Sequence, residues 1–425
     1  MRGMGYTDFL ALGEAAGRDE LVATFRLEQS PDVDFAWAAG ALAAESSIGT
    51  WDPGLTTMTE EARRLGARVI TADEATRLVK VAYLPHLFEA GNLAQLLSSV
   101  VGNVYGLREV EKLRFVDIDM PSEYVRAFPG PQLGIQGVRK MTGVHDRPIL
   151  GTIVKPKLGL GAQAWADAAY EAWSGGVDFV KDDENLTHMT FNGFYERADR
   201  VIQLKNKAEG ETGEKKLYFS NISAPVTEMK KRADHVIALG NEYVMIDILT
   251  VGWSGLQEMR SYLDGKGIAI HAHRAMHGAF SRQEDHGIDM LPISKWARLA
   301  GVDNLHAGTL GAGKMFTEGG KDHARAIYEM LQGEMHGLKP VWPVASGGLH
   351  PGVMAQLIKA VGTSDFCATS GGGIHGNPLG SRAGAKALRA AMQATLEGRT
   401  LEDEATRVPE LKAALDKWGT KPPGA

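Results

Sequence analysis

The sequence feature that most constrains the fold is a series of eight extended, apolar segments, each followed by a helical pattern. They span residues 149–155, 177–182, 216–222, 243–249, 268–274, 303–307, 341–346 and 364–369. Eight strand-and-helix units within about 250 residues are typical of a (β/α)8 TIM barrel, whose active sites form at the carboxyl ends of the strands. We therefore predict an α/β fold with a TIM barrel, and a doubly wound open sheet is the alternative.

The segment before the barrel mixes strands and helices without strict alternation. Extended patterns at 21–27, 78–83 and 113–118 are interspersed with helical patterns at 35–44 and 93–100. A chain of 425 residues is long enough for two domains. We predict an N-terminal α+β domain over residues 1–140, the barrel over 141–400, and a C-terminal extension over 401–425. The extension is expected to hold a helix at 401–418 and a disordered tail from Lys421.

Composition argues against several classes of partner. The net charge is −6 and no five like charges are consecutive, which argues against nucleic-acid and anionic-membrane partners. The single cysteine, Cys367, excludes an intrachain disulfide, and its apolar surroundings favour a buried thiol in a reducing compartment. The sequence contains neither an 18-residue apolar run nor an apolar signal core. We expect a cytoplasmic enzyme that neither spans a membrane nor binds nucleic acid.

A lysine among three carboxylates stands at the end of the second predicted strand. In an extended chain Lys181 and Asp183 point to one face and Asp182 to the other, while Glu184 lies where the loop begins. Mg²⁺ takes oxygen ligands, and an ammonium group cannot ligate it. Lys181 must therefore either change chemically or only balance charge. The structural alternative is an exposed ion pair at a strand end, which is common and weak.

Chemically active side chains also follow most of the other predicted strands. They are Lys155 and Lys157, Asn221, His271 with His273, Arg274 and His277, His306 with Lys314 in the next loop, Ser346 with Gly347 and Gly348, and Gly371 with Gly372 and Gly373. Structural residues would be scattered over both ends of a barrel, whereas these crowd one rim. Each also has a structural alternative, such as a solvated loop lysine or a hydrogen-bonded core histidine.

Two glycine-rich turns indicate phosphate binding. The turns at 346–348 and 371–373 let backbone N–H groups approach an anion closely, and helices follow both. The loops after strands seven and eight are the habitual phosphate site of TIM barrels. Arg274, His306 and Ser346 would form a second anion site across the barrel mouth. A substrate with two phosphates fits this pattern.

Long motifs in both halves of the chain resemble one family. They are AAESSIGTW at 43–51, GNVYG at 102–106, GTIVKPKLGL at 151–160, GGVDFVKDDEN at 175–185, HAHRAMH at 271–277, HAGTLGAGK at 306–314, SGGLHPG at 346–352 and GGG at 371–373. In content and order they resemble the large subunit of ribulose-1,5-bisphosphate carboxylase/oxygenase (Rubisco). The resemblance covers nearly the whole chain and looks closest to the archaeal form III type, which works without small subunits.

The resemblance implies a role for each lysine. Lys181 would react with CO₂ to give a carbamate that binds Mg²⁺ beside Asp183 and Glu184 and takes the C3 proton of ribulose 1,5-bisphosphate. Lys155 would donate the later proton, supported by Lys157 and His273. Lys314, on a closing loop, would hold the incoming CO₂, for which O₂ competes.

The resemblance also implies two phosphate sites and a shared active site. One phosphate would lie on Thr50, Trp51, Gly348, Gly371 and Gly372, beside Gly347, and the other on Arg274, His306 and Ser346. In the family, the residues corresponding to Glu45, Thr50, Trp51 and Asn103 reach the barrel of a partner subunit. A homodimer, or a ring of dimers, without small subunits is therefore expected.

Two segments depart from the family pattern. Residues 313–319 are two longer than the usual GKxEG, which bears on loop closure, and residues 374–378 differ after the phosphate glycines. Two other functions are considered. One is a Rubisco-like enolase or isomerase acting on another phosphorylated sugar or thio-sugar without CO₂ fixation. The other is a binding or assembly protein that keeps only the fold. The complete set of site residues favours the carboxylase.

Overall fold

The computed structural model describes residues 5–49, 55–314 and 320–423, which form two compact units. The first unit contains the described residues up to Pro129 together with Met276–Leu299. The second contains Gly130–Ala275 and the described residues from Ala300 onward. Residues 276–299 thus cluster with the first unit although they lie between two barrel strands in the sequence. The predicted domain boundaries at residues 140 and 400 remain a prediction.

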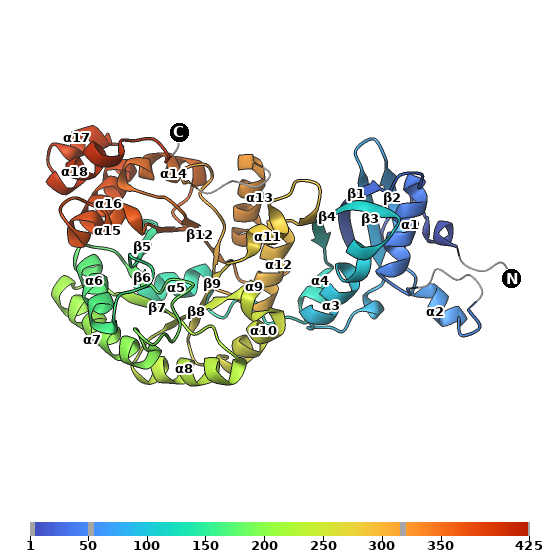
Figure 1. Cartoon of the computed structure of the whole chain (residues 1–425), viewed down its shortest axis with the longest axis horizontal. Coiled ribbons are helices and arrows are strands. Elements are labelled where there is room, and N and C mark those ends of the chain that lie inside the picture. Colours follow the sequence, from blue (N-terminus) through green and yellow to red (C-terminus); the bar gives the residue numbers. More distant parts are fainter. Residues whose placement is uncertain (1–4, 50–54, 315–319, 424–425) are drawn as a thin grey trace. The chain divides into compact units, whose positions relative to one another are not determined.

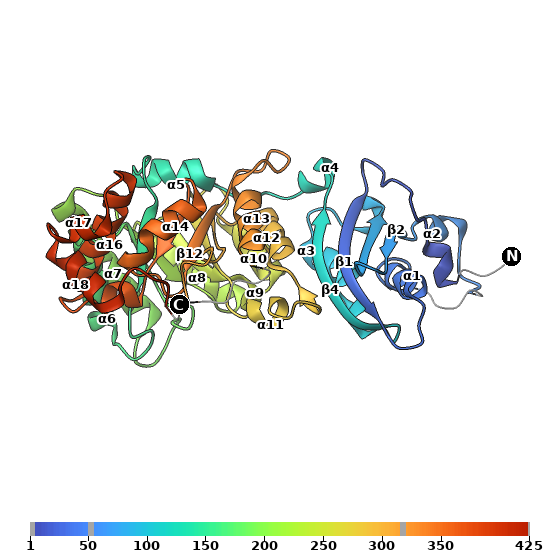
Figure 2. The ribbon, with the colours of Figure 1, turned by 90° about the horizontal axis from the view of Figure 1, so that it is seen from above.

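The first unit is built on a five-stranded mixed sheet. Its strands, in the spatial order β10-β4-β1-β3-β2, are β10 (Gly287–Ile288), β4 (Val110–Asp119), β1 (Leu21–Gln29), β3 (Leu78–Tyr83) and β2 (Arg68–Asp73). Its helices are η1 (Tyr6–Phe9), α1 (Phe35–Glu45), α2 (Glu60–Arg64), η2 (Pro85–Leu87), α3 (Leu93–Val100), η3 (Asn103–Gly106), α4 (Ser122–Val125), α11 (His277–Ser281) and α12 (Met290–Ala300, of which Ala300 falls in the second unit). Helix α1, whose N-cap Asp34 accepts from Trp37 N–H, packs on one face of the sheet (Figure 2).

The second unit is a closed barrel of eight parallel strands. They are β5 (Ile149–Ile153), β6 (Phe179–Lys181), β7 (Leu217–Asn221), β8 (Tyr243–Asp247), β9 (Ala269–His273), β11 (Asn304–His306), β12 (Trp342–Ser346) and β13 (Cys367–Thr369). The other elements of this unit are α5 (Gly134–Thr142), α6 (Ala162–Ser174), α7 (Phe194–Thr212), α8 (Val226–Ala238), α9 (Ile248–Val251), α10 (Trp253–Tyr262), α13 (Gly320–Gln332), η4 (Pro351–Val353), α14 (Met354–Val361), α15 (Gly372–His375), α16 (Ser381–Leu396), α17 (Leu401–Ala405) and α18 (Pro409–Trp418). Figure 1 shows the helices ringing the strands.

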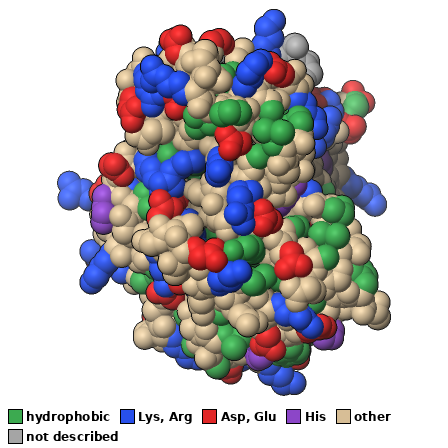
Figure 3. All heavy atoms as spheres, turned by 90° about the vertical axis from the view of Figure 1, so that its left-hand side faces the viewer, with side chains coloured by type: hydrophobic (Ala, Val, Ile, Leu, Met, Phe, Trp, Pro, Cys, Tyr) green, Lys and Arg blue, Asp and Glu red, His purple; other side chains and the backbone are tan. Residues whose placement is uncertain are grey.

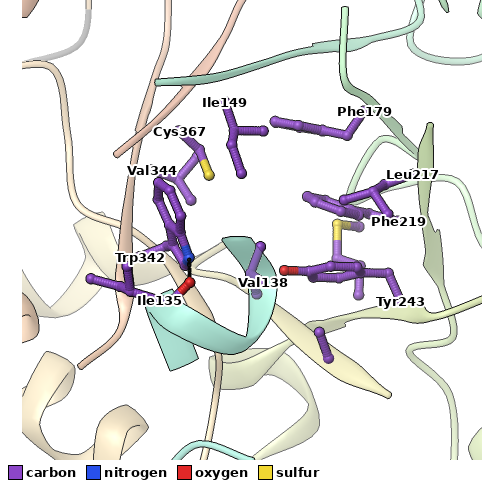
Figure 4. Close-up of a cluster of buried hydrophobic side chains, with 12 residues drawn as sticks. Ile135, Val138, Ile149, Phe179, Leu217, Phe219, Tyr243, Trp342, Val344 and Cys367 are labelled. Carbon is purple, nitrogen blue, oxygen red and sulfur yellow. Dashed lines mark hydrogen bonds between the residues drawn. The ribbon is translucent and has the colours of Figure 1, made fainter. Parts of the chain in front are cut away.

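The barrel core fills the amino-terminal half of the barrel interior. It consists of Ile135, Val138, Ile149, Phe179, Leu217, Phe219, Tyr243, Met245, Ala269, Trp342, Val344 and Cys367 (Figure 4). Helix α5 supplies Ile135 and Val138 and closes this end, where Trp342 Nε1 donates to the Ile135 carbonyl over 3.2 Å. Because successive residues alternate faces, the next inward residue after Phe179 is Lys181 and the next after Val344 is Ser346. The interior therefore changes from apolar to polar toward the carboxyl ends of the strands.

The structure confirms the eight predicted strands, and the closed barrel excludes the open-sheet alternative. One expectation about the C-terminus is wrong. The helix predicted at 401–418 is broken into α17 and α18, because Val408 precedes Pro409 and adopts an extended conformation. The disorder expected from Lys421 onward stays a prediction, although the Lys421 carbonyl lies 3.1 Å from His350 Nε2. Gly424 and Ala425 lie outside the described residues.

The distribution of charged side chains on the surface fits the absence of long runs of like charge in the sequence. Positive and negative side chains are interspersed over the face of the molecule shown in Figure 3. No helix within the described ranges is both long and apolar enough to cross a membrane. Cys367 is fully buried, as predicted, and burial raises the pKa of its thiol.

Gly151 in β5 makes room for an aromatic ring of the barrel core. A Cβ atom added to Gly151 would lie 2.2 Å from two carbons of the Phe179 ring, which stacks on Phe219 with ring centroids 4.4 Å apart. A side chain at position 151 would therefore displace an aromatic pair in a closely packed interior.

We predict that Gly151→Ala lowers the free energy of unfolding by about 1–3 kcal/mol, the usual cost of overpacking. Gly210→Ala is the matched control, because Gly210 lies in helix α7 and a Cβ atom there would meet nothing within 4 Å. Since alanine favours a helix over glycine, the free energy of unfolding of this variant should rise by about 0.5–1 kcal/mol. Urea denaturation of the two variants and the wild type measures both effects. Equal stability of Gly151→Ala and the wild type would contradict this packing.

Candidate active site

The segment that carries the candidate site is anchored by Asp182. This carboxylate is fully buried on the outer side of β6, where Arg197 of α7 pairs with it over 3.1 Å. Tyr218 Oη and the Asn221 backbone N–H also donate to it, each over 2.9 Å. A buried carboxylate needs such partners. They hold the segment in one register, with Lys181 and Asp183 turned to the inside, as the alternation of side chains predicts.

Lys181 lies in a fully buried position at the barrel mouth. Its Nζ atom donates to the Asp182 carbonyl over 2.8 Å and lies 3.7 Å from Glu184 Oε2 and 3.5 Å from Met245 Sδ. Asn221 Nδ2 donates to the carbonyl groups of Asp183 and Glu184, over 3.3 and 3.0 Å, and so holds the turn that follows the strand. The amine and the Glu184 carboxylate thus converge, and the exposed strand-end pair is excluded.

The two lysines at the end of β5 contact the same segment. Lys155 Nζ donates to Asp183 Oδ2 over 2.9 Å, and the Asp183 side chain is only 1% exposed. Lys157 is exposed and donates to Asn185 Oδ1 over 2.7 Å. The structure therefore brings together Lys155, Lys181, Asp183 and Glu184.

The charges at the mouth act on Glu184. Burial raises the pKa of this carboxyl group, but the Lys181 amine, His273 and Lys155 outweigh burial and lower the pKa to about 2. Glu184 is therefore an anion at neutral pH, which is the state that a metal ligand requires.

His273 connects this anionic group to a carboxylate on the neighbouring strand. Its Nε2 lies 3.5 Å from Glu184 Oε2, and its Nδ1 lies 2.9 Å from Asp247 Oδ1 at the end of β8. A carboxylate on one ring nitrogen holds the ring in place and presents the other nitrogen to the site. Asp247 is a site residue that the sequence analysis missed. Its signal was present, because Asp247 is a carboxylate near the carboxyl end of the strand predicted at 243–249.

Three further predicted residues lie on the opposite side of the mouth. His306 Nδ1 lies 2.6 Å from Ser346 Oγ, which joins the ends of β11 and β12. Arg274 is close to the same strands, since a Cβ atom added to Gly308 would lie 3.6 Å from its Nη2. Arg274 supplies positive charge here, and His306 and Ser346 supply polar groups, as expected for an anion site.

The glycine turns are packed against the lysines. The backbone N–H of Lys314 donates to the Gly347 carbonyl over 2.9 Å, and a Cβ atom on Gly348 would lie 2.6 Å from Lys314 Cγ. A Cβ atom on Gly371 would lie 3.0 Å from Lys155 Cε, whereas one on Gly372 would meet nothing within 4 Å. Glycine is therefore required for the close approach at 348, while Gly372 leaves its backbone open.

The first unit brings two predicted residues together. Asn103 Nδ2 donates to Glu45 Oε1 over 3.1 Å, joining η3 to the end of α1. Thr50 and Trp51, which the sequence also predicts as site residues, lie outside the described residues. So do residues 315–319, the longer segment after the loop lysine.

The carboxylate oxygens at the barrel mouth are of the kind that suits a hard cation. Asp183 and Glu184 are adjacent carboxylates, and Mg²⁺ commonly takes one or two carboxylates with other oxygen ligands. Within residues 5–49, 55–314 and 320–423, no group of three or more His, Cys, Asp and Glu side chains is arranged to hold a metal ion.

Comparisons with known proteins cover nearly the whole chain. Residues 8–124 match the family model of the ribulose bisphosphate carboxylase large chain, N-terminal domain, and residues 134–418 match that of its catalytic domain. A ribulose bisphosphate carboxylase of Pyrococcus abyssi is 47% identical over 416 residues, with 97% of each chain covered.

Two solved structures are also similar. The octameric Rubisco of Pyrococcus horikoshii, in complex with sulfate ion, has a TM-score of 0.94 and 46% identity over 99% of this chain and 98% of that chain. The dimeric archaeal Rubisco of Hyperthermus butylicus has a TM-score of 0.91 and 39% identity over 98% of this chain and 99% of that chain.

Proposed function

The chain belongs to the ribulose bisphosphate carboxylase large-chain family, and from this membership we propose that it carboxylates ribulose 1,5-bisphosphate. The observation that carries the proposal is the buried Lys181 amine beside Glu184 at the barrel mouth. Lysine is almost never fully buried without a specific reason. The overall reaction joins the bisphosphate, CO₂ and water into two molecules of 3-phosphoglycerate, and O₂ competes with CO₂ for the same enediolate.

Lys181 is the group that CO₂ activates. Its free amine adds to the carbon of CO₂, forming an N–C bond and releasing one proton, so that a carbamate replaces the amine. The carbamate and the carboxylates of Asp183 and Glu184 form an oxygen ligand set of the kind Mg²⁺ prefers. When bound there, Mg²⁺ would supply Lewis-acid stabilisation of the substrate oxygen that gains negative charge.

The remaining side chains move protons and orient the substrate. The Lys181 carbamate takes the C3 proton of the bisphosphate to give the enediolate, and Lys155 later donates a proton to the product. Lys157 and His273 support Lys155, and Asp247 fixes the His273 ring. Lys314 holds the incoming CO₂ and the new carboxylate when its loop closes and excludes water.

The two anion sites bind the two phosphates. Backbone groups at Gly348, Gly371 and Gly372 receive one phosphate, together with Thr50 and Trp51, and Arg274 with Ser346 and His306 receives the other. The close approach of Gly348 to Lys314 and of Gly371 to Lys155 supports the first of these sites, since it places both of its glycine turns beside a lysine. Binding the phosphates would then orient C2 and C3 between the lysines.

The active site is shared between two chains in this proposal. Glu45 and Asn103, which are hydrogen-bonded to each other, would act at the barrel mouth of a partner copy in a homodimer or a ring of dimers. The dimeric and octameric archaeal structures support such an assembly. We further propose that the enzyme works in the cytoplasm.

We predict that preincubation with Mg²⁺ and bicarbonate raises the activity, and that ¹⁴CO₂ then appears in 3-phosphoglycerate. Lys181→Met should abolish both the label and proton exchange at C3, because the carbamate is lost. Lys216→Met is the matched control. Lys216 is equally buried but lies just before β7, at the opposite end of the barrel, where it donates to the Val177 carbonyl and Glu214.

The outcomes of this assay separate the candidate functions. Turnover of another phosphorylated ketose without label in 3-phosphoglycerate would favour the enolase or isomerase. Full proton exchange in Lys181→Met would contradict the assignment of the base.

We predict that mixing Glu45→Gln subunits with Lys155→Ala subunits restores activity, because a hybrid dimer has one site free of both changes. Random pairing of equal amounts would give about a quarter of the wild-type activity. Mixing Lys155→Ala with Lys181→Ala is the control, since both barrels of that hybrid are defective. No recovery in the first mixture, with hybrids demonstrated by mass spectrometry, is incompatible with shared sites.

A further inference from the structure

His271 lies one step below the site residues and has no role in the function proposed above. It is fully buried in β9, and its Nε2 lies 3.0 Å from Nε2 of His306 in β11. The other nitrogen of His306 lies 2.6 Å from Ser346 Oγ in β12. These three strands are neighbours in the barrel, so one hydrogen-bonded chain runs from the interior to the rim.

Both imidazoles in this chain are neutral. Burial, followed by the nearby Lys181 and His273, lowers the pKa of His271 well below its usual value. Burial, with His273, His271, Lys181 and Arg274, does the same to the pKa of His306. A neutral imidazole carries one N–H donor and one acceptor nitrogen. The hydrogen bonds that link His271, His306 and Ser346 can therefore point in only two directions, toward Ser346 or away from it.

The free nitrogen of His271 distinguishes the two directions. Among the residues that the structure describes, no group forms a hydrogen bond with the buried His271 Nδ1. If Ser346 donated to His306, then His306 would donate to His271, and the proton of His271 would sit on Nδ1 with no acceptor. In the opposite direction the proton of His271 sits on Nε2, and only the lone pair of Nδ1 is left without a partner. Buried orphan N–H groups are the rarer case, so the second direction is favoured.

We propose that His271 is a positioning residue that sets the polarity of this chain. Its Nε2–H donates to His306 and fixes His306 as the Nδ1–H tautomer, which donates to Ser346 Oγ. The hydroxyl hydrogen of the partly exposed Ser346 is then available to the phosphorylated substrate. Since the ligand is taken to be ribulose bisphosphate, the inference rests on the proposed function.

Ring packing keeps both imidazoles in their orientations. The Phe219 ring lies over His271 with centroids 4.8 Å apart and an interplanar angle of 33°. The His271 and His306 rings meet edge to face at 4.9 Å, and His273 lies 4.5 Å from His306 on another side. A ring flip of His271 would have to displace these neighbours.

Neutron diffraction from crystals of the wild-type enzyme tests the polarity directly. Deuterium is expected on Nε2 of His271 and on Nδ1 of His306. Deuterium on Nδ1 of His271 or on Nε2 of His306 would overturn the inference. This measurement needs no variant and no substrate.

Binding of ribulose bisphosphate to the CO₂-free enzyme, measured by calorimetry, tests the consequence for the substrate. His271→Met removes the donor at similar volume and should raise the dissociation constant about tenfold, the value of one hydrogen bond. His271→Gln keeps a side-chain N–H and should restore binding. His235→Gln, on the outer surface beside Asp199, is the control and should bind as tightly as the wild type.

Ser346→Ala should weaken binding as much as His271→Met, and the double variant no further, because both residues act through one hydrogen bond. Wild-type affinity in either single variant would overturn the inference. If His271→Met does not fold, the affinity of Ser346→Ala and the deuterium positions in the wild type still test the inference. If the wild type carboxylates its substrate but Ser346→Ala binds ribulose bisphosphate as tightly as the wild type, only the inference is refuted. If binding depends on Ser346 but no label appears in 3-phosphoglycerate, only the proposed function is refuted.

Discussion

The alternation of side chains through Lys181, Asp182 and Asp183 is the constraint on which the barrel mouth depends. Asp182 is fixed on the outer side by Arg197, Tyr218 and a backbone N–H, so its two neighbours must face inward. A slip of one residue would turn Asp182 into the barrel and remove the amine from the mouth. The cost of leaving Asp182 without partners prevents that slip. A buried ion pair outside the barrel thus determines which groups meet inside it.

The division of the barrel interior into two layers follows from the same periodicity. Large apolar residues fill the amino-terminal half, and Gly151 leaves space for the Phe179 ring that stacks on Phe219. One step further along the strands, the inward residues are amines, carboxylates and imidazoles. Burial lowers the pKa of His271 and of His306, so in the proposed hydrogen-bonded chain these imidazoles act through their tautomers and not through their charge. The packed lower layer gives the polar groups a rigid support.

Much of this arrangement was predictable from the sequence, because buried parallel strands appear as short apolar runs and their carboxyl ends carry the polar residues. The strands and the crowding of polar residues at one rim of the barrel were predicted on that basis. Asp247 was missed because it stands within the apolar run Tyr243–Ile248. The clustering of residues 276–299 with the first unit and the two unequal nitrogens of His271 depend on contacts between distant segments, which no local pattern reports. The break before Pro409 was a local signal that the helical periodicity outweighed.

Conversion of the Lys181 amine into an oxygen ligand is the chemical step on which the proposed function depends. The most direct test is ¹³C NMR of the wild-type enzyme with ¹³C-bicarbonate and Mg²⁺. One protein-bound carbamate resonance per chain is predicted, and it should be absent from Lys181→Met and present in Lys216→Met. A carboxylating wild-type enzyme without such a resonance, or a resonance that persists in Lys181→Met, would contradict the assignment.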